Sequence, residues 1–371
     1  MVFWVTNRFR DKAAGWNFYR LGAGLTRGVV ERLGREDRRL IESTLKRRAP
    51  MASGVLCRFV GRWGWRTAFG GVVAAFAMAA PAAAQDLGPY VALGDSYTSA
   101  PFVLYPTGKP IGCGRSDHNY PHLVARAVTP SSFTDVSCGS ATTEDMTSSQ
   151  AVPLNGTNPP QFNALNANVG LVTIGIGGND VGLTGIATTC AELDLTRPTG
   201  SACRDEFTAD GDEVGERIAA AAPKIAAALQ GIHARAPTAR VLVVGYPDAL
   251  PPDGRGCWPV VPVSPADASW FDEQMRRMNQ MLAEQAAANG AEYIDVYTSS
   301  IGHDACKLPG VKWLEGLVPT APAFPEHPNA MGEVNMARQV IGAIDPAAQI
   351  PPPKPLNLLP LDSPIPNWQV G

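Results

Sequence analysis

Five short runs of β-branched and apolar residues alternate along the chain with segments of helical periodicity. The runs predict buried strands over residues 90–93, 133–137, 169–176, 240–245 and 291–296. Helical patterns cover residues 120–128, 212–235, 267–289 and 329–344. Near-continuous apolar strands that alternate with helices are typical of a parallel sheet covered on both faces. The sequence therefore predicts a three-layer α/β fold with a five-stranded parallel sheet.

The periodic pattern has clear limits. We expect one domain over residues 85–346, because no internal repeat is visible there. Residues 347–371 are rich in proline and poor in large apolar side chains, which predicts a disordered, extended tail. Within the helix over residues 212–235, Pro223 predicts a kink or a restart.

Charge divides the chain into two unlike parts. Residues 1–84 carry 15 Lys and Arg against 5 Asp and Glu, a net charge of +10, and the remainder carries 16 against 29, a net charge of −13. A mature surface this acidic repels phosphate backbones. Nucleic acid is therefore not an expected partner.

Residues 51–84 have the composition of a secretory signal peptide. An arginine-rich start precedes an apolar stretch and three alanines that end at Ala84. The apolar stretch is shorter than the roughly 20 residues that span a bilayer, which favours a signal peptide over a membrane anchor. Met51 is then an alternative start, and residues 1–50 are a non-native or disordered extension. We expect a secreted protein that is cleaved near Ala84.

Export to an oxidising compartment permits disulfides. Six cysteines follow the predicted signal peptide and allow 15 pairings. The simplest pairing is sequential, because each bridge then brackets one segment between strands: Cys113 with Cys138, Cys190 with Cys203, and Cys257 with Cys306. Metal binding is the competing interpretation, but the sequence has no Cys-x-x-Cys motif and no close Cys/His cluster. We therefore predict no metal site.

Polar clusters follow the first three predicted strands. They are Gly94-Asp95-Ser96, Cys138-Gly139-Ser140 and Gly177-Gly178-Asn179-Asp180. Because parallel sheets place their sites at the carboxyl ends of the strands, these clusters are expected to meet at one edge. Ser96 is the candidate nucleophile, although an ordinary turn after a strand uses the same residue types.

A serine nucleophile needs a base with a pKa near neutrality, and histidine fits best. The chain has five: His118, His122, His233, His303 and His327. We choose His327, since its loop directly precedes the last predicted helix and can reach back over the sheet edge. His303 is the second choice.

Gly94-Asp95-Ser96-Tyr97, Gly177-Gly178-Asn179-Asp180 and His327-Pro328, in this order, resemble the motifs of the SGNH (GDSL-type) hydrolases. The resemblance covers about residues 88–345 and is greatest to secreted actinobacterial lipases and esterases with three disulfides. It implies a flavodoxin-like fold and ester hydrolysis without a cofactor. It also implies an oxyanion hole made by the Ser96 backbone N–H, a backbone N–H of the second cluster and the Asn179 side-chain amide.

The chain departs from the family pattern at two positions. Ser140 stands where the family usually has glycine, so the second donor is assigned to Ser140, with Gly139 as the alternative. Phe324 stands where many members have an aspartate three residues before the histidine. We therefore expect the Phe324 backbone carbonyl to orient His327, with the Glu326 carboxylate as the rival.

The sequence defines the type of reaction more closely than it defines the substrate. We expect a carboxylesterase or lipase that acts on small-molecule or lipid esters of medium chain length, contacts lipid surfaces transiently and is monomeric. Residues 101–106 are apolar enough to line an acyl pocket, although a loop packed on the core has the same composition. The alternatives are a polysaccharide deacetylase, a phospholipase, or a non-catalytic extracellular binding protein with the same fold.

Overall fold

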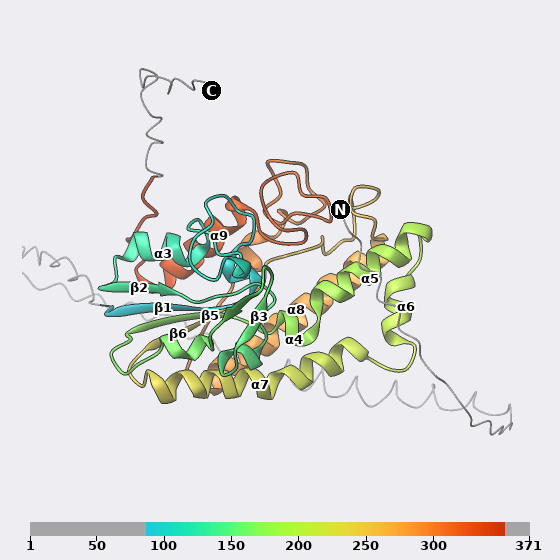
Figure 1. Ribbon diagram of the computed structural model, residues 1–371. Helices are drawn as coiled ribbons and strands as arrows, with labels where there is room; N and C mark the ends of the chain where they lie inside the picture. The colour runs from blue at the N-terminus through green and yellow to red at the C-terminus, as the bar shows by residue number, and fades with distance from the viewer. Residues whose placement is uncertain (1–86, 353–371) are drawn as a thin grey trace, which may run out of the picture. The chain divides into compact units, whose positions relative to one another are not determined.

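The computed structural model describes residues 87–352 (Figure 1). The predicted extension over residues 1–50, the signal peptide over 51–84 and most of the tail over 347–371 lie outside these residues. The strands are β1 (Pro89–Gly94), β2 (Ser132–Asp135), β3 (Gln150–Val152), β4 (Gly156–Asn158), β5 (Leu171–Gly175), β6 (Arg240–Val244) and β7 (Glu292–Ile294). The helices are α2 (Ser96–Ser99), α3 (Tyr120–Val128), α4 (Gly178–Val181), α5 (Leu183–Thr196), α6 (Ala202–Thr208), α7 (Glu213–Arg235), α8 (Pro265–Ala288) and α9 (Ala330–Ile344).

The central sheet has the order β2-β1-β5-β6-β7, and all four pairings are parallel. This confirms the predicted five-stranded parallel sheet and its flavodoxin-like order. The direction of winding reverses between β1 and β5, where Gly94 lies opposite Gly175. In such sheets, ligands bind outside the carboxyl ends of the strands at this reversal. Ser96 follows β1 at that point.

Each face of the sheet has its own core. Helices α3 and α9 cover one face, and α7 and α8 cover the other (Figure 1). Along β1, Tyr90 and Ala92 join the core on the α3/α9 side, while Val91 and Leu93 join the core on the α7/α8 side. Since successive side chains of a strand point to opposite faces, a strand buried on both sides has to be apolar throughout. The near-continuous apolar runs in the sequence have this origin.

Helix α7 runs from Glu213 to Arg235 with Pro223 inside it, so the predicted restart was wrong. Pro223 and Ala219, whose carbonyl loses its helical donor to the proline, both lie on the exposed side of the helix. Water can therefore satisfy the free carbonyl. Helices α5 and α6 and the β3–β4 hairpin were not predicted, and α5 is rich in threonine, a poor helix former.

The three disulfides join Cys113 to Cys138, Cys190 to Cys203, and Cys257 to Cys306, which confirms the sequential pairing. Cys138, Cys257 and Cys306 follow β2, β6 and β7 in the chain, and the Cys190–Cys203 bridge links α5 to α6. Within residues 87–352, no helix is both long enough and apolar enough to cross a bilayer.

Candidate active site

Ser96 stands on a sharp turn from β1 into α2. Gly94 has a φ of +150°, and a side chain there would come within 2.6 Å of the Gly175 carbonyl oxygen, so the turn requires glycine. The amide of Gln161 clamps this residue: its Oε1 accepts from Gly94 N–H at 2.8 Å and its Nε2 donates to Gly94 C=O at 2.9 Å. The strand end that carries Ser96 is therefore held rigidly.

Asp95 joins the ends of three strands. Its carboxylate accepts from Tyr97 N–H at 2.9 Å, which caps α2, and from the Tyr246 hydroxyl at 2.5 Å. The Tyr246 oxygen in turn accepts from Gly178 N–H at 2.8 Å. Burial raises the pKa of Asp95 to about 7, against the lowering effect of these two hydrogen bonds. The network fixes the polar clusters after β1 and β5 relative to the end of β6.

His327 is positioned by a short antiparallel pairing ahead of α9. Glu315 N–H donates to His327 C=O, and Asn329 N–H donates to Trp313 C=O, each at 2.9 Å. The Asn329 side chain caps the first turn of α9. This arrangement brings His327 Nε2 to 2.6 Å from Ser96 Oγ, across 231 residues of sequence.

The carbonyl that binds the imidazole is that of Pro325, not Phe324 as expected. His327 Nδ1 lies 2.7 Å from Pro325 C=O, while Phe324 C=O accepts the His327 backbone N–H at 3.2 Å. Residues 324–327 form a turn with proline second and Glu326 third, at a φ of +64°. The turn hydrogen bond uses the Phe324 carbonyl, which leaves the next carbonyl to face the ring. The expectation was wrong by one residue, and the Glu326 carboxylate makes no hydrogen bond to the ring either.

The environment of His327 suits a general base. Because a carbonyl only accepts, Nδ1 carries the proton and Nε2 is free to accept from Ser96. Burial lowers the pKa of His327 below its usual 6.5, against the raising effect of the Pro325 carbonyl. The ring lies 4.8 Å from that of Tyr97 and 5.3 Å from that of Phe324, centre to centre. The neutral imidazole is thus the stable form near neutral pH.

The second cluster offers one backbone donor. Gly139 N–H donates to Cys113 C=O at 2.9 Å, so this donor is already occupied. The N–H groups of Ser140 and Ser96 make no hydrogen bond within the described residues. Ser140 has a φ of +63°, the left-handed conformation that glycine adopts most easily. The serine therefore takes the backbone shape of the glycine that the resemblance led us to expect.

Asn179 supplies the third group. Its Nδ2 donates one proton to Ala141 C=O at 2.8 Å, and an amide has a second proton to give. The following residue, Asp180, accepts from Thr143 N–H at 2.9 Å and Thr143 Oγ1 at 2.6 Å. These contacts tie the third cluster to the second.

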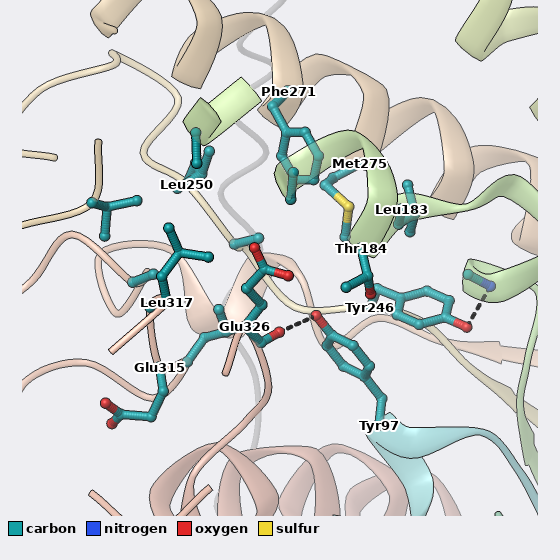
Figure 2. A pocket seen from close by; sticks show the side chains of 18 of the residues that line it. Tyr97, Leu183, Thr184, Tyr246, Leu250, Phe271, Met275, Glu315, Leu317 and Glu326 are labelled. Atoms are coloured by element: carbon teal, nitrogen blue, oxygen red, sulfur yellow. Dashed lines mark hydrogen bonds between the residues drawn. The ribbon is translucent and has the colours of Figure 1, made fainter. Parts of the chain in front are cut away.

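A pocket opens beside Ser96 and encloses about 730 Å³ of space, part of it open to solvent (Figure 2). Most of its walls are apolar side chains of α5, α8 and the loops that follow β6 and β7: Leu183, Ala187, Ala191, Ala249, Leu250, Val261, Val263, Phe271, Met275, Ala305, Leu314 and Leu317. The Cys190–Cys203 and Cys257–Cys306 disulfides brace two of these walls. Residues 101–106 do not line this pocket, and Phe102 is 70% exposed, so that expectation was wrong.

The other histidines lie outside the site. The ring of His303 stacks on Trp313 and its Nδ1 binds the Val311 carbonyl at 2.6 Å. His118 pairs with Asp117. The hydrogen bond to Ser96 Oγ comes from His327, whereas His303 Nδ1 binds the Val311 carbonyl, so the second-choice base is not the one brought to Ser96.

Over residues 92–333, the sequence matches the GDSL-like Lipase/Acylhydrolase family. The chain belongs to this family. It is therefore a carboxylic ester hydrolase, as the sequence predicted. It is 37% identical over 277 residues to Lipase 2 of Streptomyces coelicolor, which is 74% of this chain and 92% of that protein.

Two solved structures are similar to this family member along most of their own length. The extracellular lipase of Streptomyces rimosus is 29% identical, with a TM-score of 0.56, and the match covers 69% of this chain and 99% of that one. Phospholipase A1 of Streptomyces albidoflavus NA297 is 28% identical, with a TM-score of 0.56, and the match covers 69% and 98%.

Sequence reasoning missed several residues that shape the site of this hydrolase: Tyr97, Gln161, Tyr246, Pro325 and Asn329. Tyr246 comes two residues after the end of β6, so the rule that found the first three clusters also points to it. Gln161 begins a short 3-10 helix (Gln161–Ala164), and nothing in the sequence signals its contact with Gly94.

Proposed function

We propose that Ser96 and His327 form a catalytic dyad that hydrolyses carboxylic esters through an acyl-enzyme. The observation that carries this is the hydrogen bond of 2.6 Å between Ser96 Oγ and His327 Nε2 beside an apolar pocket. His327 takes the hydroxyl proton as Oγ attacks the ester carbonyl. The same proton passes to the departing alcohol, and water then cleaves the acyl-enzyme with His327 again as base.

The negative oxygen of the intermediate needs donors fixed in advance. We assign this role to the N–H groups of Ser96 and Ser140 and to the Asn179 amide. The unoccupied N–H groups of the two serines support the assignment, as does the position of Asn179 on the pocket wall. The Pro325 carbonyl holds the imidazole in place and stabilises its charged form.

We propose that the acyl chain of the substrate lies in the apolar pocket. We also propose that the substrate is a water-insoluble ester. Exposed apolar side chains lie next to the loop that carries His327: Phe102, Leu104, Tyr105, Phe324 and Met331. The ring of Phe324 connects this apolar rim to His327, and Phe102 stacks on Phe324 at 5.6 Å between ring centres. A rim of this kind suits transient contact with lipid. Phospholipids are a second candidate substrate, as the similarity to a phospholipase A1 suggests.

We also propose that the mature protein is exported and begins near Gln85. The three disulfides support export, because such bonds persist in oxidising compartments.

Labelling with a fluorophosphonate tests the dyad. The oxidised protein is expected to be labelled at Ser96, and Ser96→Ala is expected to abolish both labelling and hydrolysis of p-nitrophenyl octanoate. His327→Ala should slow both, because it removes the base while the donors remain. A folded wild-type protein that is not labelled would exclude the serine mechanism.

A further inference from the structure

One ionisable side chain in the pocket has no partner. Five titratable residues line the cavity: Asp95, Tyr97, Tyr246, Glu315 and Glu326. Four of them are hydrogen-bonded through their side chains. The Glu326 carboxyl, by contrast, makes no hydrogen bond or ion pair within the described residues.

The other titratable residues of the pocket all have hydrogen-bond partners. The Tyr97 hydroxyl donates to the Glu326 backbone carbonyl at 2.7 Å, and Asp95 binds Tyr246. Glu315, fully buried, lies 2.8 Å from Lys312 Nζ and also accepts from Asn329 and Thr320. No cation faces Glu326 from any pocket wall, since the lining residues include no lysine, arginine or histidine.

The Glu326 side chain is aimed at the substrate space. Its backbone carbonyl faces Tyr97, and Figure 2 shows the carboxyl pointing away from that tyrosine, toward the apolar side chains of the pocket. Glu326 adopts a φ of +64°, and its neighbour His327 contacts Ser96. The left-handed backbone turns the imidazole toward the nucleophile and the carboxyl into the cavity.

An alkyl chain that fills the pocket would displace water from this carboxyl and give it no partner. Leaving a buried polar group unpaired costs roughly 5- to 150-fold in affinity. Burial raises the pKa of Glu326 to about 7, so both the acid and the carboxylate are populated near neutral pH. A hydroxyl group can pair with both protonation states of Glu326, because it donates a hydrogen bond to the carboxylate and accepts one from the acid.

We propose that Glu326 is a specificity-determining residue that selects esters whose acyl chain carries a hydroxyl group. This rests on the proposed function, since it requires the acyl chain to occupy the pocket beside Ser96. Sites built to hydrogen-bond a substrate hydroxyl discriminate strongly against analogues that lack it.

The test compares p-nitrophenyl octanoate with hydroxyoctanoates that carry the hydroxyl near the start or the end of the chain. Wild type is expected to favour at least one hydroxyoctanoate by about 5-fold or more in kcat/KM. Glu326→Met, similar in length but with no group that donates or strongly accepts a hydrogen bond, is expected to lose this preference, and Glu326→Gln to retain part of it. Comparing ratios between variants cancels the intrinsic reactivity of each ester.

A second readout is the pH dependence of KM for the plain octanoate. In wild type, KM should increase as pH rises through about 7, because burying an unpaired carboxylate costs more free energy than burying the unpaired acid. In Glu326→Met and Glu326→Gln this rise should be absent. A hydroxyl-to-plain ratio that is the same in all three proteins for every ester would overturn the proposal. Fluorophosphonate labelling of each variant separates that result from a failure of the serine mechanism.

Discussion

His327 lies between Ser96, the proposed nucleophile, and the Pro325 carbonyl, with no carboxylate in contact with its ring. A carbonyl fixes the tautomer as a carboxylate would, but it carries only a partial charge, so it does less to hold the proton on the ring. Burial therefore dominates, and the pKa of His327 falls below 6.5. The base stays neutral, and hence competent, into mildly acidic solution.

The pH profile checks this. Protonation inactivates the base, so activity is lost as pH falls through the pKa of His327 in the folded protein. Since that pKa is lowered, the acid limb of kcat/KM should have its midpoint below 6.5. The measurement uses Glu326→Gln and p-nitrophenyl acetate, so that the carboxyl with a pKa of about 7 does not contribute. A midpoint near 7 would instead assign the limb to Asp95.

At the scale of residues, the sequence predicted the positions of some site residues and missed others, for physical reasons. Ser96 comes two residues after β1 and Asn179 four residues after β5, and a strand end dictates where its next residues lie. The orienting carbonyl depends on a turn whose shape is set by the pairing of residues 313–316 with 326–329. Such tertiary pairing is not encoded locally, and the expectation missed by one residue.

At the scale of elements, the strands were predictable because burial on both faces leaves only apolar residues in them. The pocket was not predictable from the sequence, because its walls come from segments far apart in the chain, including the unpredicted α5. Two disulfides hold these walls. Cys257–Cys306 spans 49 residues and links the loop that carries Val261 to the loop that carries Ala305.

Removing that bridge should affect stability and the acyl pocket together. Cys257→Ser/Cys306→Ser is expected to lose about 4 kcal/mol of unfolding free energy on the loop-entropy model. Its KM for p-nitrophenyl octanoate should rise more than its KM for the acetate, which reaches less of the pocket. The control is Cys113→Ser/Cys138→Ser, a bridge beside Ser140 that spans 25 residues. This control variant should lose a similar amount of unfolding free energy but have a lower kcat for both esters. Equal changes in KM in the two variants would show that the Cys257–Cys306 bridge has no special effect on the acyl pocket.

At the scale of the whole molecule, the predicted net charge of −13 after residue 84 contrasts with the apolar rim around the His327 loop. An acidic surface favours solubility, and in the proposed function the apolar rim would contact a lipid phase. The rim and the pocket are adjacent through Phe324. A substrate leaving a lipid droplet would have a short path to Ser96.

Two exposed positions with matched backbones test the rim. Phe102 and Leu154 have φ values of +65° and +64° and exposed fractions of 70% and 81%. Phe102→Asp should slow hydrolysis of emulsified tributyrin about tenfold, since it removes apolar area from the contact, and spare soluble p-nitrophenyl butyrate. Leu154→Asp, on the β3–β4 turn, should change neither rate. Equal losses on both substrates in Phe102→Asp would contradict a role in lipid contact.

The hydrogen bond between Ser96 and His327 joins residues 231 positions apart. A chain leaves the ribosome N-terminus first, at about 5 to 20 residues per second. Ser96 is therefore made roughly 10 to 50 s before His327, the base proposed to activate it. Throughout that interval the growing chain holds Ser96 without His327, so the proposed dyad can form only after the segment that precedes α9 has been made.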